Sequence, residues 1–371
     1  MITFREVTGK KDLKKFVDFQ FDLYKGDPFW VPPLKQDELR ILDPGVNPAY
    51  KFCDGKFWIA EKNGRMVGRI GGLINHRYNE KAGLKIGRIT RMEFEDDPAV
   101  SSGLFEKVEE WLKNNGMSAV HGPLGFTNID NQGLLIEGFG YLPSIASVHN
   151  KPYYRKHFED FGFGKENDWI EFQLKLGEEI PEKAIRLADV IRKRFNLEIV
   201  HFSNPSEMKA AGQDVFRLLN KAFGDLPYVT PFDPELTQFY LDKYFKVLNP
   251  EFAVVIRKDG EIRAFILGMP SLSRAMQKAN GRLFPFGLFH IMRAIRKPKV
   301  MDLLLTGVDP EYQAMGLPAI LIAELQKSMM KHKVRLVETT GIFESNQKAI
   351  QHWKNYDHIQ HKRRRCFVKD L

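Results

Sequence analysis

An internal repeat constrains the fold of this chain more than any other feature of its sequence. Asn63-Gly64 separates two β-rich segments in the first half, and Asp259-Gly260 separates two similar segments in the second half. Either dipeptide between such segments is a strong signal of a β-hairpin, because a type I′ turn needs two residues with positive φ. The sequence therefore predicts one hairpin in each half.

Further landmarks flank both hairpins in the same order. Given for the first half and then for the second, they are a strand (Ile2–Val7; Glu198–Phe202), an amphipathic helix (Lys10–Tyr24; Ser206–Phe223), a proline-aromatic segment (Pro28–Pro32; Pro227–Pro231) and, after the hairpin, another helix (Ala99–Asn114; Leu317–Lys331). One shared order of so many landmarks favours two homologous α/β domains, each with a mixed sheet. We place them at residues 1–176 and 197–371. A connecting helix is expected within residues 177–196, where Pro181 precedes apolar residues at helical spacing.

Composition and cysteine usage fit a soluble globular protein of a reducing compartment. The chain of 371 residues is 43% hydrophobic and 28% charged, and its first residues lack the apolar core of a signal peptide. Its apolar runs fall short of the ~20 residues of a membrane span. Cys53 and Cys366 form no spaced framework, so we expect structural thiols and a cytoplasmic protein.

The formal charge of +9 indicates an anionic partner, and the basic residues gather in two clusters. Arg293–Lys299 follows the apolar segment Gly281–Met292, which could lie on an anionic membrane or cover a long acyl chain. Packing of this helix against its own domain is the favoured interpretation, so peripheral membrane contact is possible but not expected. Lys362–Arg365 is interpreted as a solvated basic face. The histidines around it (His352, His358 and His361) are interpreted in the same way.

The segment that begins at Val300 carries the chemistry. Val300–Val308 predicts a buried strand, and Gln313–Gly316 forms a glycine-containing turn before the helix at Leu317. A turn of this kind directs unpaired N–H groups to the point where the positive end of the helix lies. The arrangement predicts a pyrophosphate site.

This stretch resembles the GCN5-related N-acetyltransferase (GNAT) superfamily, whose coenzyme A loop reads Gln/Arg-x-x-Gly-x-Gly/Ala after a Val-x-Pro-x-Tyr lead-in. Val308–Tyr312 matches the lead-in, and Gln313 and Gly316 match the loop. The next strand (Val334–Thr340) and an Asn-x-x-Ala helix start at Asn346 continue the resemblance. It implies two tandem GNAT-like domains, acetyl-CoA or another acyl-CoA as cosubstrate and no metal. It also implies a small-molecule or peptide amine as acceptor, with nucleic acid not expected.

The resemblance also implies roles for individual residues. The expected coenzyme A contacts are Gly307, Val308, Gln313, Ala314, Met315, Gly316, Leu317, Ala319 and Asn346. For Asn346, a simple helix cap is an equally good interpretation. Asp302, on the strand before the loop, is the first candidate for the general base, and Glu338 on the following strand is the second.

Two positions depart from the family pattern, and the first half departs further. Pro318 has no N–H group to offer a phosphate, and Trp353 stands where the superfamily often has a tyrosine that acts as general acid. In the first half, the acidic stretch Glu95–Asp97 precedes the position of the loop. Because these carboxylates would repel a pyrophosphate, we expect coenzyme A to bind only the second half.

Three functions remain open from the sequence. The leading hypothesis is an enzyme in which an amine attacks an acyl-CoA directly, since neither cysteine has a histidine placed beside it by a motif. The first alternative is a related two-domain transferase that uses an aminoacyl-tRNA and a cell-wall precursor. The second is a non-catalytic coenzyme A-binding sensor or scaffold, for which Trp353 is the argument.

Overall fold

The computed structural model describes residues 1–371, except for the side chain of Asn355. The first half contains β1 (Ile2–Glu6), α1 (Gly9–Leu23), α2 (Lys35–Leu42), η1 (Pro48–Lys51), β2 (Cys53–Lys62), β3 (Arg65–Asn75), α3 (His76–Ala82), β4 (Ile86–Phe94), α4 (Pro98–Asn114), β5 (Ala119–Gly122), β6 (Leu134–Glu137), α5 (Tyr154–Asp160) and β7 (Gly164–Lys175). After α6 (Glu182–Phe195), the second half contains β8 (Glu198–His201), α7 (Pro205–Phe223), α8 (Pro234–Tyr244), η2 (Pro250–Phe252), β9 (Ala253–Lys258), β10 (Glu261–Pro270), α9 (Ser273–Ala279), α10 (Gly287–Arg296), β11 (Val300–Val308), η3 (Pro310–Met315), α11 (Leu317–Lys331), β12 (Leu336–Thr339), β13 (Ile342–Phe343), α12 (Gln347–Gln351), η4 (His352–Asn355) and β14 (Asp357–Asp370).

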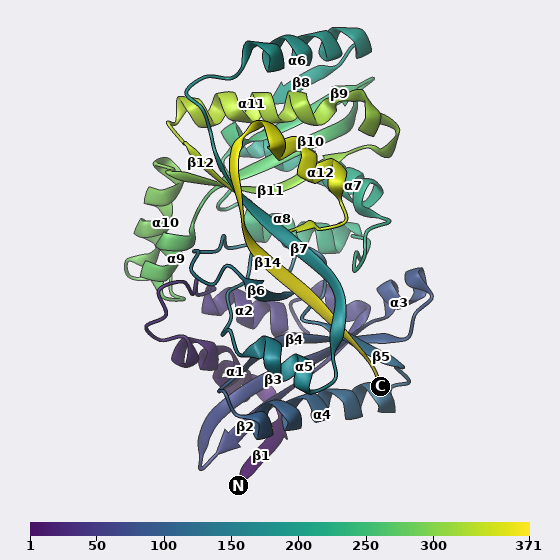
Figure 1. The fold of residues 1–371 in the computed structure, drawn as a ribbon, viewed down its shortest axis with the longest axis vertical. Coiled ribbons are helices and arrows are strands. Elements are labelled where there is room, and N and C mark those ends of the chain that lie inside the picture. Colours follow the sequence, from purple (N-terminus) through teal and green to yellow (C-terminus); the bar gives the residue numbers. More distant parts are fainter.

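The order of elements repeats between the halves, and each half forms one end of the molecule (Figure 1). The two hairpin turns adopt the same left-handed backbone, with φ of 54° and 76° at Asn63 and Gly64 and of 52° and 79° at Asp259 and Gly260. The expected fold of mixed α/β character is confirmed. Among the described residues, no helix has the length and apolarity needed to cross a membrane.

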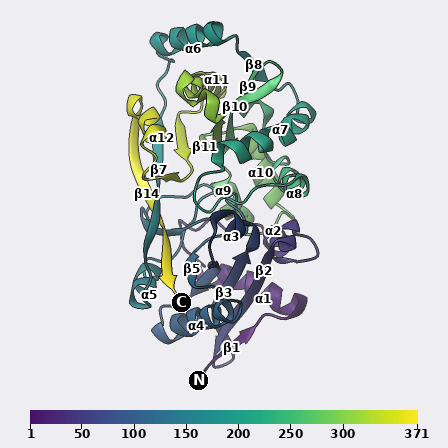
Figure 2. The same cartoon turned by 90° about the vertical axis from the view of Figure 1, so that its right-hand side faces the viewer.

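One mixed sheet runs through both halves, because two strands cross between them. The strand order is β1-β2-β3-β4-β5-β14-β7-β12-β11-β10-β9-β8. The C-terminal strand β14 lies between β5 and β7, and β7 pairs on its other side with β12 of the second half. Figures 1 and 2 show β7 and β14 running together from one half to the other. The division into residues 1–176 and 197–371 is based on the sequence repeat and on the connecting segment that contains α6. The sheet itself does not divide at these residues, because it is continuous through both halves.

The basic segment of β14 is buried, so its interpretation as a solvated face was wrong. Lys362 is 1% exposed and Arg364 is 4% exposed. Their charges lie beside Glu171 of β7, with Nε of Arg364 2.7 Å from Oε1 of that glutamate. His361 is buried in the same place. A cation can stay buried here because the neighbouring strand supplies the opposite charge.

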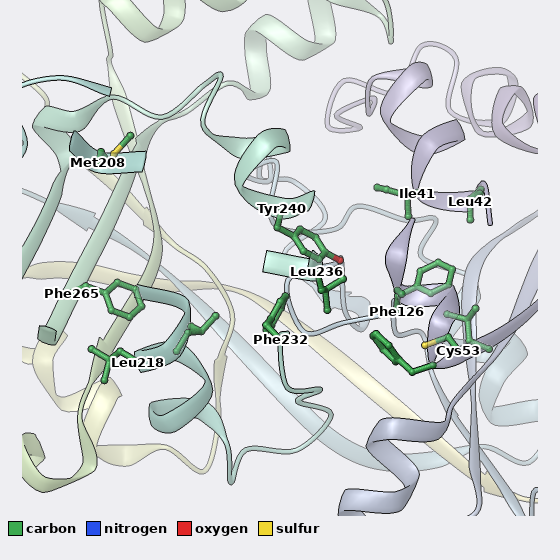
Figure 3. Packing of buried hydrophobic residues seen from close by; sticks show 14 of the residues in the cluster. Ile41, Leu42, Cys53, Phe126, Met208, Leu218, Phe232, Leu236, Tyr240 and Phe265 are labelled. Carbon is green, nitrogen blue, oxygen red and sulfur yellow. The ribbon is translucent and has the colours of Figure 1, made fainter. Parts of the chain in front are cut away.

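A hydrophobic cluster also joins the halves (Figure 3). From the first half it includes residues of α2, β2 and the loop after β5, and from the second half residues of α7, α8 and β10. The labelled members are Ile41, Leu42, Cys53, Phe126, Met208, Leu218, Phe232, Leu236, Tyr240 and Phe265. The halves are therefore joined by both a sheet and a core.

Candidate active site

The candidate site begins where β11 and β12 separate. The two strands pair in parallel from Val300 with Leu336 to Leu303 with Thr339, while β11 continues to Val308. Thr340 closes the pairing, because its N–H donates to the Leu303 carbonyl (3.2 Å) and its hydroxyl to the Leu304 carbonyl (3.0 Å). Beyond this point the free edge of β11 borders a cleft.

The cleft has a volume of about 900 Å³ and a polar and an apolar part. Its polar part includes residues of the η3 loop and of the start of α12, such as Gln313 and Asn346. Its apolar part is built mainly by α7, α8 and strands β9 and β10. The large apolar side chains there are Met208, Val215, Phe216, Leu219, Phe223, Tyr240, Leu241, Tyr244, Phe245, Leu248, Phe265 and Leu267. The cleft therefore offers polar groups to a charged part of a ligand and an apolar wall to an aliphatic chain.

The loop between η3 and α11 forms a cradle for an anion. Gly316 has a φ of 78° and precedes the first residue of α11, whose N-terminus has no side-chain cap. Pro318 has no N–H group, and the N–H of Ala319 donates to the Gly316 carbonyl at 3.0 Å. The N–H groups of Gln313, Ala314 and Met315 lie within the 3-10 helix η3, where each N–H bonds to the carbonyl three residues before it. The candidate donors to a phosphate are therefore the N–H groups of Gly316 and of Leu317, whose side chain is fully buried in the core.

Ion pairs fix this loop to the rest of the second half. Asp309 accepts the N–H of Glu311 (3.1 Å), and its carboxylate lies 2.9 Å from Nζ of Lys221 on α7 and 3.2 Å from Nη1 of Arg263 on β10. Burial opposes ionisation of Asp309, but the ion pairs outweigh it and hold its pKa below the ordinary value. The loop is thus positioned before any ligand arrives.

The residues that flank α12 on either side, Asn346 before it and His352 after it, both line the cleft. The side-chain oxygen of Asn346 accepts the N–H of Ala349 (3.1 Å), so Asn346 caps α12 while it also lines the cleft. A contact of Asn346 with the cofactor stays a prediction. His352, interpreted from the sequence as solvated, also lines the cleft.

Trp353 lines the cleft and is 7% exposed, and its indole N–H has no partner in the described part of the chain. The hydroxyl of Tyr356 instead donates to Oε1 of Gln326 on α11 (3.3 Å), outside the cleft lining. A buried donor without a partner is rare in proteins. A molecule bound in the cleft would offer the indole N–H an acceptor. The sequence indicated only that Trp353 lacks the acidity of the tyrosine found there in the family, and it did not suggest this role as a hydrogen-bond donor.

Neither candidate base lines the cleft. Asp302 is fully buried, and neither carboxylate oxygen has a hydrogen-bond partner among the described residues. Burial raises the pKa of Asp302 to about 8. It is paired in register with Glu338 on β12, which is 8% exposed.

Glu338 stays ionised although it is buried. Its Oε1 accepts from Gln173 (2.7 Å), and its Oε2 lies 2.7 Å from Nε2 of His361. Burial would raise the pKa of Glu338, but the bonds from His361 and Gln173 outweigh this and lower it. Near pH 7, Asp302 is therefore mostly protonated and Glu338 carries the charge.

The first half has no equivalent free helix end. The side chain of Asp97 caps α4 by accepting the N–H of Ala99 (3.0 Å) and pairs with Lys62 (2.9 Å). A carboxylate thus occupies the place where the second half offers free amides. This difference supports the prediction that coenzyme A binds only the second half.

The two cysteines are buried and poorly suited to covalent chemistry. Burial raises the pKa of Cys53 to about 12 and raises that of Cys366 well above its ordinary value. Cys366 donates to Oε2 of Glu166 at 3.2 Å. Because a thiolate is the nucleophilic form, neither side chain is suited to form an acyl-enzyme.

Comparisons with known proteins agree with this geometry. Residues 213–356 match the model of the acetyltransferase (GNAT) family. Protein YghO of Escherichia coli (strain K12) is 29% identical over 379 residues, covering 99% of this chain and 95% of that protein. The bacterial ceramide synthase of Caulobacter vibrioides is 25% identical over 367 residues, covering 97% and 95%.

Among solved structures, a tandem GNAT protein from the clavulanic acid biosynthesis pathway has a TM-score of 0.57. The alignment covers 100% of this chain and 98% of that one at 12% sequence identity. At that identity the likeness concerns the fold alone. It confirms a tandem GNAT fold over the whole chain.

Proposed function

The chain belongs to the GNAT acetyltransferase superfamily, and we propose that it transfers a fatty acyl group from acyl-CoA to an amine by direct attack. The observation that carries the proposal is the apolar part of the cleft, formed by α7, α8, β9 and β10 next to the anion cradle. An acetyl group would leave this part empty, whereas an aliphatic chain would fill it. Similarity to a bacterial ceramide synthase supports a fatty acyl chain as well.

The bound acyl-CoA would supply an activated thioester carbonyl. In the transfer, the amine nitrogen bonds to the carbonyl carbon, the carbon–sulfur bond breaks, and coenzyme A leaves with the electron pair. The N–H groups of Gly316 and Leu317 would hold the pyrophosphate, and the edge of β11 at Gly307 and Val308 would lie beside the pantetheine arm. Among the remaining predicted contacts, we retain Gln313, Ala314, Met315 and Asn346 as proposals, and Ala319 without its N–H group, which is bonded to the Gly316 carbonyl.

The amine must lose a proton as it attacks. We assign this proton to Glu338 ahead of Asp302, because Glu338 is the carboxylate that is ionised near pH 7. A water between the cleft and Glu338 would have to carry the proton, since its side chain does not line the cleft. The indole N–H of Trp353 would bind the ligand as a hydrogen-bond donor.

A substitution that fills the apolar part tests the proposal. Val215 lies on α7 in the cleft wall, so Val215→Trp should exclude a long chain while it spares a short one. We expect the ratio of kcat/KM for palmitoyl-CoA over acetyl-CoA to fall at least tenfold, since each excluded methylene loses about 0.8 kcal/mol. Amine acylation is followed by mass spectrometry.

Arg217→Trp is the matched control, because Arg217 lies on the same helix with a side chain 77% exposed. This variant should keep the wild-type ratio. If wild-type protein prefers acetyl-CoA, or if Val215→Trp lowers the rates of both donors equally, the chain does not lie where we place it.

A further inference from the structure

The loop before α10 and the outer face of α10 expose large apolar side chains. Phe284, Phe286 and Phe289 are 76%, 71% and 64% exposed, and Leu288 and Met292 are exposed beside them. The expectation that this segment packs against its own domain holds only for its inner face, where Ile291 is buried. The outer face forms an apolar ridge with no partner in the described part of the chain.

The segment that carries this ridge is also strongly basic. Between Ser271 and Met301 the chain has seven Lys or Arg residues and neither Asp nor Glu. All seven side chains are exposed, namely those of Arg274, Lys278, Arg282, Arg293, Arg296, Lys297 and Lys299. Such a set of cations favours an anionic partner.

A hollow of about 840 Å³ opens beside the ridge, between α9 and the loop after α1. Trp30, stacked on Tyr24 with 5.1 Å between ring centroids, lines it together with the exposed cations Lys25, Lys278 and Arg282. Two carboxylates also lie there. Asp27 pairs with Lys151 at 3.1 Å, whereas Asp22 is exposed. The hollow can accept a phosphate beside an aromatic wall.

We propose that this face docks on an anionic phospholipid bilayer. Phe284, Phe286 and Phe289 would enter the boundary between headgroups and acyl chains, the cations of α9 and α10 would meet the lipid phosphates, and the hollow would take one headgroup. Exposed phenylalanines on a segment rich in exposed cations are the combination that binds membrane interfaces. A nucleic acid would pair with the cations but would give the exposed phenyl rings no hydrocarbon to enter.

Docking in this orientation would bring the bilayer close to the cleft. Leu248, Met269 and Leu304 belong to the hydrophobic cluster under α9 and α10, and the same three side chains line the cleft. In Figure 1, α9 and α10 lie at the left edge of the second half, beside β11. The surface exists whichever amine is acylated, so this inference does not depend on the proposed function.

Flotation of the full-length protein with vesicles tests the inference. The protein should bind vesicles of phosphatidylcholine mixed with phosphatidylglycerol and should bind pure phosphatidylcholine much more weakly. Phe286→Ser/Phe289→Ser should weaken binding at least tenfold, because the apolar contribution of two buried rings is lost. Arg293→Gln/Arg296→Gln should weaken it roughly 25-fold, at about fivefold for each charge.

Helix α6 provides matched controls at the far end of the second half (Figure 1). It also exposes apolar side chains (Leu187, 49%; Val190, 61%) and cations (Lys193 and Arg194). Leu187→Ser/Val190→Ser and Lys193→Gln/Arg194→Gln should bind vesicles like the wild type.

Three outcomes would overturn the inference: no binding of wild-type protein to the anionic vesicles, equal loss in the α6 variants, or unchanged binding in the α10 variants. Should the phenylalanine variant fail to fold, the arginine variant decides, since its two side chains are exposed. Binding to RNA but not to vesicles would mean that the cations serve a polyanion, and it would refute the membrane assignment.

Discussion

Gly316 combines a left-handed backbone with a position at the free end of α11, and a carboxylate there tests the anion cradle. Gly316→Glu should weaken coenzyme A binding about hundredfold, because a negative charge a few ångströms from the pyrophosphate costs roughly 3 kcal/mol. The substitution also strains the backbone by about 1–2 kcal/mol at a φ of 78°. Isothermal titration calorimetry with coenzyme A measures the loss.

An added Cβ at Gly316 would also lie 2.8 Å from Cδ1 of Ile191 on α6. Gly316→Gln meets the same contact without a charge, so it should lose much less affinity than Gly316→Glu, and Gly260→Glu controls for the left-handed backbone. Gly260 has a φ of 79° with no atom within 4 Å of an added Cβ, so it carries the same backbone penalty in the β9–β10 hairpin. Its affinity for coenzyme A should match that of wild-type protein. Gly103 would not serve as a control, because a Cβ there would lie 2.1 Å from the Phe4 ring. Equal losses of coenzyme A affinity in the variants at positions 260 and 316 would mean that the cradle is not part of the coenzyme A site.

The buried Asp302 makes stability depend on pH. Its pKa is about 8 in the folded protein and close to ~3.9 in the unfolded chain. The folded state therefore binds more protons between these values, and stability falls as pH rises from about 4 to 8. Asp302→Asn removes this titration. The stability of the variant relative to wild type should therefore rise across that window, by up to about 5 kcal/mol.

Urea unfolding at several pH values within this window checks the prediction. Asn is nearly isosteric with Asp, so any constant difference between the two proteins reflects packing and hydrogen bonding alone. If the difference in unfolding free energy between the two proteins does not change with pH, the carboxyl of Asp302 keeps an ordinary pKa. Asp302 would then be ionised near pH 7 and would again be a candidate for the base beside Glu338.

At the level of helices and strands, the sequence correctly predicted the elements that are determined by residues close together in the chain. The hairpin turns, the helix at Leu317–Lys331 and the strand at Val300–Val308 depend on neighbouring residues, and the structure has all of them. The anion cradle was predictable for the same reason, because its glycine, strand and helix are contiguous.

The burial of β14 could not be predicted in this way. Lys362 and Arg364 are basic residues near the end of the chain, which by themselves indicate a solvated segment. Their partner Glu171 precedes them by almost 200 residues and meets them only because β7 and β14 pair. Likewise, the apolar wall of the cleft gathers α7, α8 and β10 in space, and no motif in any one of them marks a binding site. Both the burial of β14 and the apolar wall of the cleft thus depend on contacts between distant segments, which the sequence patterns did not reveal.

At the scale of the whole molecule, the C-terminal strand should couple the stability of the two halves. Phe367 on β14 is 1% exposed and stacks on Phe158 of the first half, with 4.8 Å between ring centroids. Phe367→Ala should destabilise the protein by about 3–5 kcal/mol through the cavity that it leaves. Ile359→Ala on the same strand should cost no more than about 0.5 kcal/mol, since Ile359 is 45% exposed.

The distribution of this loss along the chain is the decisive measurement. Opening of β14 removes the neighbour of β5 and of β7 together, and β7 in turn supports β12. Amides of β5 in the first half and of β12 in the second should therefore lose hydrogen-exchange protection by the same amount in Phe367→Ala. If protection falls only in β4 and β5, then β7 and β14 do not transmit stability between the halves, and the two halves unfold as separate units despite their common sheet. Equal losses would mean that a substitution four residues from the C-terminus weakens the cradle and the first half alike.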